Sequence, residues 1–277
     1  MNEFPENPEA VPVVLSEVAP QSATDLLSVV PAPPSDPAWN GWDLVKLLSI
    51  TIVALAISMI GVLLAARSWS HPHRDVTELA RNAVVVVLGQ GIGYLIVFAY
   101  MYILVTRERR RPDFLAAIHW NWPANPATYM MWGIVLSVAL QALAHVLPIP
   151  KDLPIDNFFR TPAEAWVVTI FGITLAPVME ELLFRAFLYP VLKRQLGMGG
   201  AVLLTAVGFA LLHGSQLKFA WGPLLVIFLV GLVLTLARAR KNSVAASLLM
   251  HVAYNSTISV LMFIGTDGFR HLEKLNQ

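Results

Sequence analysis

The sequence predicts an all-α polytopic transmembrane helical bundle with about seven spans, or eight. Its 277 residues are 56% hydrophobic and only 13% charged, which is about half the charged fraction of an average soluble domain. Long stretches carry no Asp, Glu, Lys or Arg, among them residues 83–105, 128–147 and 221–237. About 20 consecutive apolar residues span a bilayer as a helix, so we expect the lipid bilayer to surround most of the chain.

The first 40 residues differ in composition from the rest. They contain eight prolines, six acidic residues and no Lys or Arg. A proline-rich, acidic segment does not bury enough apolar surface to fold, so we expect a disordered N-terminal tail over residues 1–40. Residues 41–277 then form the transmembrane domain.

Seven spans follow from the apolar stretches and from the residues at their borders. Tryptophans gather near the proposed span ends, where aromatic side chains anchor helices at the membrane surface. Prolines lie in several of the connections. The predicted spans are residues 43–66, 83–106, 128–148, 164–190, 198–214, 220–237 and 243–265.

Basic clusters follow the second, fourth and sixth spans, and all three fall on one side of a seven-span bundle. Loops rich in Lys and Arg remain cytoplasmic, so we expect the N-terminus inside and the C-terminus outside, in the inner membrane if the cell is bacterial. The net charge of +1 gives no field that would favour nucleic acid as a partner. The clusters are Arg107, Arg109, Arg110 and Arg111; Lys193 and Arg194; and Arg238, Arg240 and Lys241.

Polar side chains lie inside three of the predicted spans. Ionisable residues at such positions are rare, mostly face the bundle interior and are candidates for function. At 1.5 Å per residue, the carboxylate and imidazole groups would lie roughly 12–22 Å from the cytoplasmic side, so the three spans could bring them together. They are Glu180, Glu181 and Arg185 in the fourth span, His213 in the fifth, and His251 and Asn255 in the seventh. Phe209, four residues before His213 on the same helical face, is expected to support the site structurally.

The two adjacent glutamates should have different roles, because neighbouring residues on a helix point about 100° apart. Glu181 and Arg185 have the i, i+4 spacing and the order that favour a helical ion pair. We therefore expect Glu181 to be the structural partner of Arg185, which leaves Glu180 free to act as a general base. A buried network of purely structural Glu and Arg side chains is the alternative.

The imidazole and amide groups complete a set suited to hydrolysis. We expect His213 to assist Glu180 in activating water, and His251 and Asn255, one turn apart on one face, to stabilise an oxyanion. The chain has no cysteine, which excludes thiolate ligands and a cysteine nucleophile. Zinc accepts histidine nitrogen and carboxylate oxygen, so Glu180, His213 and His251 would be its ligands. The same residues fit a metal-free mechanism equally well.

The three motifs together resemble the CPBP family of Abi or CAAX-type intramembrane proteases, similar to the type II CAAX prenyl endopeptidases. The motifs are Glu-Glu-x-x-x-Arg at 180–185, Phe-x-x-x-His at 209–213 and His-x-x-x-Asn at 251–255, and the resemblance covers about residues 165–265. It implies a helical core with a cavity open to the cytoplasm and a membrane-associated protein or peptide substrate, such as a prenylated CAAX-type C-terminus. It also places Glu180, His213, His251 and Asn255 at active-site positions.

Two other classes of function stay open at this point. An ion- or proton-coupled transporter would use the same Glu and His residues as a relay, although the sequence shows no internal repeat of the kind that many transporters carry. A catalytically silent immunity or scaffold protein would keep the site without turnover. The interpretation that best fits the residues is an intramembrane endopeptidase.

Overall fold

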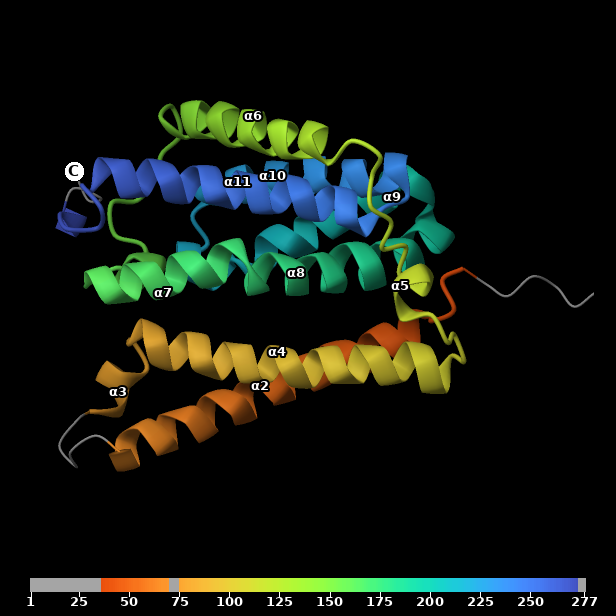
Figure 1. Ribbon diagram of the computed structural model, residues 1–277, viewed down its shortest axis with the longest axis horizontal. Helices are drawn as coiled ribbons and strands as arrows, with labels where there is room; N and C mark the ends of the chain where they lie inside the picture. The colour runs from red at the N-terminus through yellow and green to blue at the C-terminus, as the bar shows by residue number, and fades with distance from the viewer. Residues whose placement is uncertain (1–35, 70–74, 274–277) are drawn as a thin grey trace, which may run out of the picture. The chain divides into compact units, whose positions relative to one another are not determined.

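The computed structural model describes residues 36–69 and 75–273, and in this part of the chain every regular element is a helix (Figure 1). The expected disordered tail lies, up to residue 35, outside the described residues. The elements are α2 (Gly41–Trp69), α3 (Val76–Leu79), α4 (Ala83–Ile103), η1 (Leu104–Glu108), α5 (Phe114–Ala117), α6 (Pro126–Ala144), η2 (Pro154–Phe158), α7 (Pro162–Ile173), α8 (Leu175–Glu181), η3 (Leu182–Leu188), α9 (Tyr189–Leu212), η4 (Gly214–Leu217), α10 (Trp221–Lys241) and α11 (Val244–Gly265).

Six helical runs of the described chain are long and apolar enough to cross a membrane. Five of them each correspond to one predicted span. The remaining run, Pro162–Leu212, combines the predicted fourth and fifth spans in 51 residues. A straight helix of that length would measure about 77 Å, far more than a bilayer core of about 30 Å. The chain therefore turns back within this run, at Gly197, whose φ of 71° and ψ of 178° interrupt α9.

The first arm of this run is itself broken at Thr174, whose φ of −121° and ψ of −87° separate α7 from α8. Pro177 follows three residues later and has no N–H to continue the helical hydrogen bonds. The carbonyl of Gly172, just before the break, accepts a hydrogen bond from Asn255 Nδ2 at 2.7 Å. A side chain of α11 thus bonds the last turn of α7 at this break.

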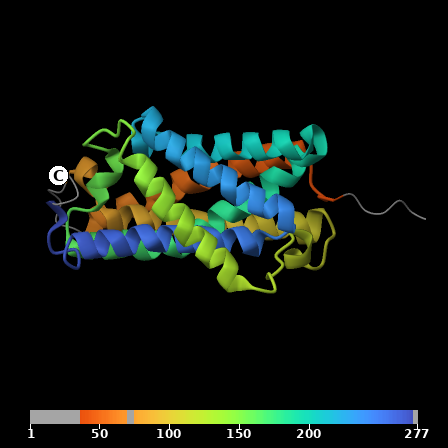
Figure 2. The same cartoon turned by 90° about the horizontal axis from the view of Figure 1, so that it is seen from above.

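The helices pack as a hairpin of α2 and α4 on one side and a layer of α6, α10 and α11 on the other, with α7 and α8 between them (Figure 1). Figure 2 shows α6 crossing over α11. Close approach needs glycine at two crossings. A Cβ at Gly93 would lie 3.2 Å from the Cα of Leu55, and one at Gly133 would lie 2.8 Å from the Cβ of Ala253.

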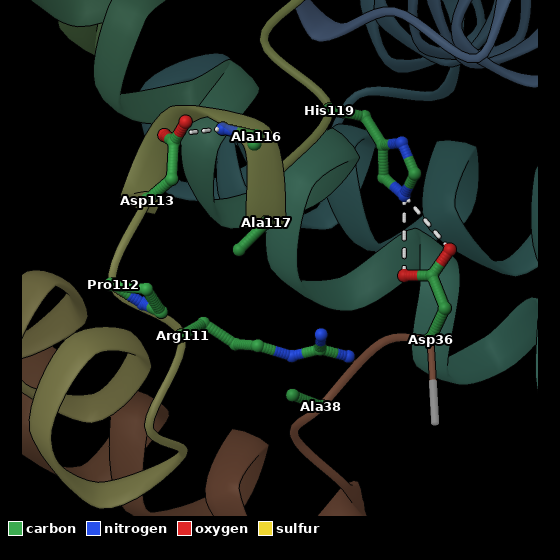
Figure 3. A pocket seen from close by; sticks show the side chains of 8 residues that line it. All are labelled: Asp36, Ala38, Arg111, Pro112, Asp113, Ala116, Ala117 and His119. Atoms are coloured by element: carbon green, nitrogen blue, oxygen red, sulfur yellow. Dashed lines mark hydrogen bonds and ion pairs between the residues drawn. The ribbon is translucent and has the colours of Figure 1, made fainter. Parts of the chain in front are cut away.

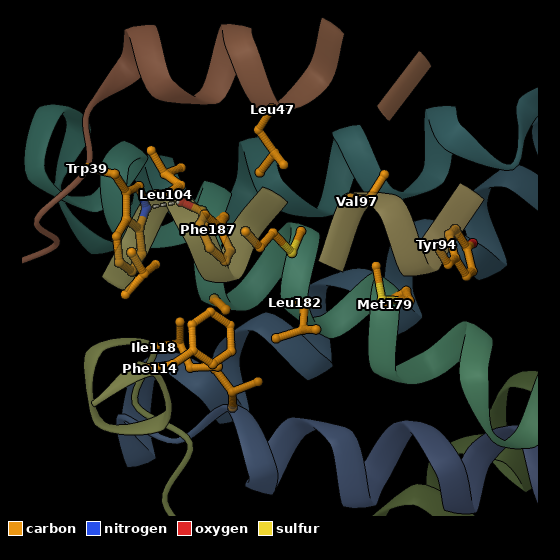
Figure 4. Packing of buried hydrophobic residues seen from close by; sticks show 14 of the residues in the cluster. Trp39, Leu47, Tyr94, Val97, Leu104, Phe114, Ile118, Met179, Leu182 and Phe187 are labelled. Carbon is orange, nitrogen blue, oxygen red and sulfur yellow. Dashed lines mark hydrogen bonds between the residues drawn. The ribbon is translucent and has the colours of Figure 1, made fainter. Parts of the chain in front are cut away.

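Two apolar cores lie on opposite sides of the α8–η3 segment. Figure 4 shows the first, in which Leu47 of α2 and Val97 of α4 pack with Met179, Leu182 and Phe187. The second joins α6, η3, α9, α10 and α11. Its buried members are Leu140, Phe184, Phe209, Val230, Leu234, Met250 and Tyr254. The α8–η3 segment is therefore covered on both sides, and polar groups placed on it are shielded from lipid.

The chain before α2 is packed against the bundle, although the sequence places residues 36–40 in the tail. Trp39 is 1% exposed, stacks on Phe187 and donates its indole N–H to the Phe187 carbonyl at 3.0 Å. Arg194 donates to the carbonyls of Pro37 and Trp39 at 3.1 and 3.2 Å. A buried tryptophan and an arginine clamp thus fix the chain just ahead of the first span.

The three basic clusters lie at one end of the bundle, as the seven-span scheme requires. Arg109, after α4, pairs with Asp43 at the start of α2. Arg194 holds the chain that leads into α2, and Asn242, after α10, contacts His119 at 3.1 Å. We call this end, which includes α5 in Figure 1, the basic end.

Candidate active site

Glu180 faces two imidazoles that come from different helices. Its Oε2 lies 3.6 Å from Nε2 of His251 on α11, and its Oε1 lies 3.9 Å from Nε2 of His213 at the end of α9. A straight helix would place Glu180 and His213 about 50 Å apart, so the reversal at Gly197 creates this contact. The three side chains that sequence places at a common depth do meet.

The other ring nitrogen of each imidazole is engaged. His213 Nδ1 lies 2.9 Å from the carbonyl oxygen of Phe209, and His251 Nδ1 lies 3.0 Å from Oε1 of Glu181. Carbonyl and carboxylate oxygens only accept hydrogen bonds, so both Nδ1 atoms are donors. In the neutral rings, both Nε2 atoms then carry lone pairs that face Glu180. Their distances exceed direct hydrogen-bond range and suit a bridging water.

Access to this group is uneven. The side chain of Glu180 is 13% exposed and that of His213 is 20% exposed, whereas that of His251 is 3% exposed. The face formed by Glu180 and His213 is therefore the one that a water molecule can reach. His251 lies behind it, in contact with the buried network.

Glu181 is enclosed and fully bonded. Its Oε1 accepts from Arg185 at 3.0 Å and from His251 Nδ1, and its Oε2 accepts from the hydroxyl of Ser247 at 2.6 Å. Both Glu181 and Arg185 are 0% exposed. The expected ion pair between them is confirmed, and the network adds a contact with His251 that the spacing alone does not predict.

Arg185 distributes its remaining donors over α10. Its Nε donates to the hydroxyl of Thr235 at 3.3 Å and its second terminal nitrogen donates to the carbonyl of Gly231 at 3.1 Å. Its guanidinium carbon also lies 4.5 Å from the ring centroid of Phe209. Carboxylate, carbonyl, hydroxyl and ring face together compensate the burial of this cation.

Phe209 packs between the arginine and both imidazoles. Its ring centroid lies 4.9 Å from that of His213 and 5.8 Å from that of His251, and it meets Phe184 edge-on at 5.3 Å. The ring therefore limits the movement of both histidines while its backbone carbonyl fixes His213 Nδ1. These contacts suit a residue that supports the site structurally.

Asn255 has a different neighbour from the other motif residues. Its amide donates to Gly172 on α7, and it lines a cavity of about 150 Å³ with Phe159, Val168 and Met262 among others. One amide hydrogen is therefore committed to the end of α7. The expected role as an oxyanion donor depends on the second hydrogen of the same amide group.

Two residues of the site, Ser247 and Arg238, lie outside the three motifs. Ser247 lies one turn before His251 on the same face as His251 and Asn255, so helical spacing could have revealed it. Arg238, 2% exposed, donates to the carbonyl of Arg185 at 3.2 Å and to Asn242 at 2.7 Å. The π-helix η3 shifts backbone bonding away from the usual pattern, and no sequence spacing predicts which side chain binds such a carbonyl.

A larger cavity lies elsewhere, at the basic end. It measures about 370 Å³ and is lined by Asp36, Arg111, Asp113 and His119 among others (Figure 3). His119 pairs with Asp36 there at 3.0 Å. None of the motif residues lines this cavity, so it is separate from the group around Glu180.

The donor types of Glu180, His213 and His251 suit zinc. Within the residues that the structure describes, however, no three His, Asp or Glu side chains are grouped in a way that would hold a metal ion.

Residues 162–257 match the Rce1-like family model, which is described as type II CAAX prenyl endopeptidase Rce1-like. The matched segment runs from α7 into α11 and contains all three motifs. Comparisons with curated proteins and with solved structures give no match. Residues 162–257 are thus similar to the type II CAAX prenyl endopeptidase family that the three motifs resemble.

Proposed function

We propose that this protein is an intramembrane endopeptidase in which Glu180 activates water to attack a peptide carbonyl. The observation that carries the proposal is the group around Glu180. One partly accessible carboxylate faces two Nε2 atoms whose rings are held by Nδ1–H bonds. Three acceptors around one small space suit a water molecule that must lose a proton.

In the first step, Glu180 accepts a proton from water while His213 Nε2 accepts the other hydrogen bond. The resulting hydroxide character at the water oxygen makes it a nucleophile for the scissile carbonyl. Both acceptors lie on the accessible face, where substrate and water arrive together. No step of this mechanism passes through a metal ion.

In the second step, His251 stabilises the tetrahedral oxyanion. Its neutral ring has no hydrogen on Nε2, so Glu180, whose Oε2 lies 3.6 Å away, passes to it the proton taken from water. Glu181, bonded to Nδ1, favours that imidazolium, as the buried carboxylate does in a Ser-His-Asp triad. The second amide hydrogen of Asn255 is the other oxyanion donor. Transfer of the same proton from His251 Nε2 to the leaving amine completes hydrolysis and leaves the ring neutral again.

We infer a membrane-associated protein or peptide as the substrate, with a prenylated CAAX-type C-terminus as the specific candidate. The family description supports this class, and the helical runs are long and apolar enough to hold the protein in a bilayer. We assign the basic end to the cytoplasm because three clusters of Lys and Arg meet there.

The test is hydrolysis by the purified protein in lipid nanodiscs. A quenched fluorescent peptide with a prenylated CAAX terminus is compared with the same peptide without the prenyl group. We expect cleavage of the prenylated peptide by the wild type and none by Glu180→Gln. The control is Glu78→Gln, which changes an exposed glutamate of α3 that lies outside the motifs.

The same variants separate the competing functions. Ion or proton flux in proteoliposomes that depends on Glu180, without cleavage of either peptide, would indicate a transporter. Equal cleavage by wild type and Glu180→Gln would contradict the mechanism.

A further inference from the structure

Ser247 occupies a position in the buried network that the motifs do not explain. It is 0% exposed, lies on α11 and places its hydroxyl oxygen 2.6 Å from Oε2 of Glu181. The same oxygen lies 3.0 Å from the carbonyl of Val244 in its own helix. A serine in an apolar helix usually bonds back to its own backbone, so a bond to a carboxylate of another helix needs a separate explanation.

The single hydroxyl proton must choose between these two acceptors. A carboxylate is the stronger acceptor, and 2.6 Å is the length of a charge-assisted O–H···O⁻ bond. The Ser247 hydroxyl therefore donates to Glu181. It is the donor that occupies Oε2, whereas Arg185 and His251 both bind Oε1.

Because different donors bind the two carboxylate oxygens, the Glu181 carboxylate is fixed in rotation. Without a donor on Oε2, the carboxylate could turn about its last bond and offer either oxygen to Arg185. The bond to His251 Nδ1 would then lose its fixed direction. Because His251 packs its Nε2 toward Glu180 at 3.6 Å, any turn of the ring changes which nitrogen and which lone pair face the reacting space.

We propose that Ser247 is a positioning residue that acts through Glu181 to hold His251 with Nδ1 protonated and Nε2 directed at Glu180. The sequence Ser-x-x-x-His-x-x-x-Asn at 247, 251 and 255 is then one functional stripe of α11, in which each residue binds a partner outside its own helix. Its effect on catalysis rests on the proposed function. Its effect on the ring of His251 does not.

The direct measurement is ¹⁵N NMR of histidine-labelled protein in nanodiscs. The His251 signals are assigned as those that disappear from the spectrum of His251→Gln. In the wild type we expect one tautomer, protonated at Nδ1 and bare at Nε2. In Ser247→Ala we expect exchange between tautomers or loss of the Nδ1–H signal. Ser247→Thr keeps the hydroxyl and should restore the wild-type spectrum.

The activity measurement uses the same variants. Ser247→Ala should lower kcat by roughly 10- to 100-fold with little change in KM, since misplacement of a catalytic group by about 1 Å can cost 10² in rate. The matched control is Thr257→Val, also on α11, which removes a hydroxyl bonded only to the Ala253 carbonyl of its own helix at 2.8 Å. It should leave both the spectrum and kcat unchanged.

The outcomes distinguish this proposal from the proposed function. An unchanged His251 tautomer in Ser247→Ala overturns the positioning role, whatever the activity. A changed tautomer in a protein that cleaves no peptide supports the positioning of His251 and counts against the peptidase assignment.

Discussion

The α8–η3 segment carries two neighbouring glutamates in opposite surroundings. Glu181 has every oxygen occupied, by Arg185, His251 and Ser247, and is 0% exposed. Glu180, one residue earlier, faces its two imidazoles only at 3.6 and 3.9 Å and is partly accessible. The difference shows how identical side chains can be divided between structure and chemistry. A carboxylate with fixed donors cannot take up a proton easily, whereas one with uncommitted oxygens can.

The largest expected effect on turnover comes from replacing Glu180, the partly accessible glutamate. Glu180→Gln should lower kcat by about 10²–10⁴, the usual contribution of a general base, while the thermal unfolding midpoint stays near that of the wild type. Turnover and unfolding are measured on the same nanodisc preparation. A large drop in the unfolding midpoint would mean that Glu180 is structural as well.

Replacing Glu181, the buried glutamate, should instead lower the stability of the fold. Glu181→Gln leaves Arg185 buried without its carboxylate, and breaking a buried ion pair typically costs about 3–5 kcal/mol. We expect a lower yield of folded protein and a lower unfolding midpoint, measured in mild detergent. If Glu181→Gln folded normally and only lost turnover, the two roles would be reversed.

Asn255 combines a role in the proposed chemistry with a structural contact. Removing one oxyanion donor typically costs about 10²–10³ in rate, so Asn255→Ala should keep at least as much activity as Glu180→Gln. Because its amide also binds Gly172, a small loss of stability should accompany the loss of rate. Asn255→Asp, which keeps an acceptor but not the donors, should behave like the alanine variant in kcat.

Substitution of Gly231 tests how closely α9 and α10 pack against each other. A Cβ there would lie 3.1 Å from Phe209 Cδ1 and 3.2 Å from the Cα of Ala206, so Gly231→Ala should cost about 1–3 kcal/mol through overpacking. The control is Gly61→Ala on α2, where a Cβ meets no atom within 4 Å. Equal unfolding midpoints for the two variants would contradict the close approach of α9 and α10.

The smallest effect is expected from metal removal. The proposed mechanism uses water activated by Glu180 and no metal ion, so exhaustive chelation should leave kcat unchanged. Loss of activity that returns specifically with zinc would instead make His213 and His251 ligands.

The sequence predicted the parts of this molecule that depend on local pattern. The apolar runs located the helices, and the i, i+4 spacing identified the ion pair of Glu181 with Arg185. The motif order indicated that Glu180, His213 and His251 would meet. Each of these follows from helical periodicity or from the cost of polar groups in lipid.

The rest depends on contacts that periodicity does not encode. Arg238 reads from the sequence as one member of a cytoplasmic basic cluster, yet it is buried against the Arg185 carbonyl. Trp39 reads as part of a tail, yet it is anchored on Phe187. Both partners are backbone carbonyls of η3. Every residue has a backbone carbonyl, so the sequence does not indicate which carbonyl a side chain will bind.

The bond between Arg238 and η3 has a consequence for how the protein assembles in the bilayer. In formal charges, Glu180, Glu181 and Arg185 leave the α8–η3 segment with one net negative charge, and Arg238 supplies the matching positive charge from α10. Neither helix is electrically neutral alone, and an unbalanced charge is costly at membrane depth. The negative charge of α8–η3 has Arg238 beside it only when the two helices have docked. Insertion and packing of this pair are therefore coupled, and the docked state is the one in which both helices can reside in lipid at low cost.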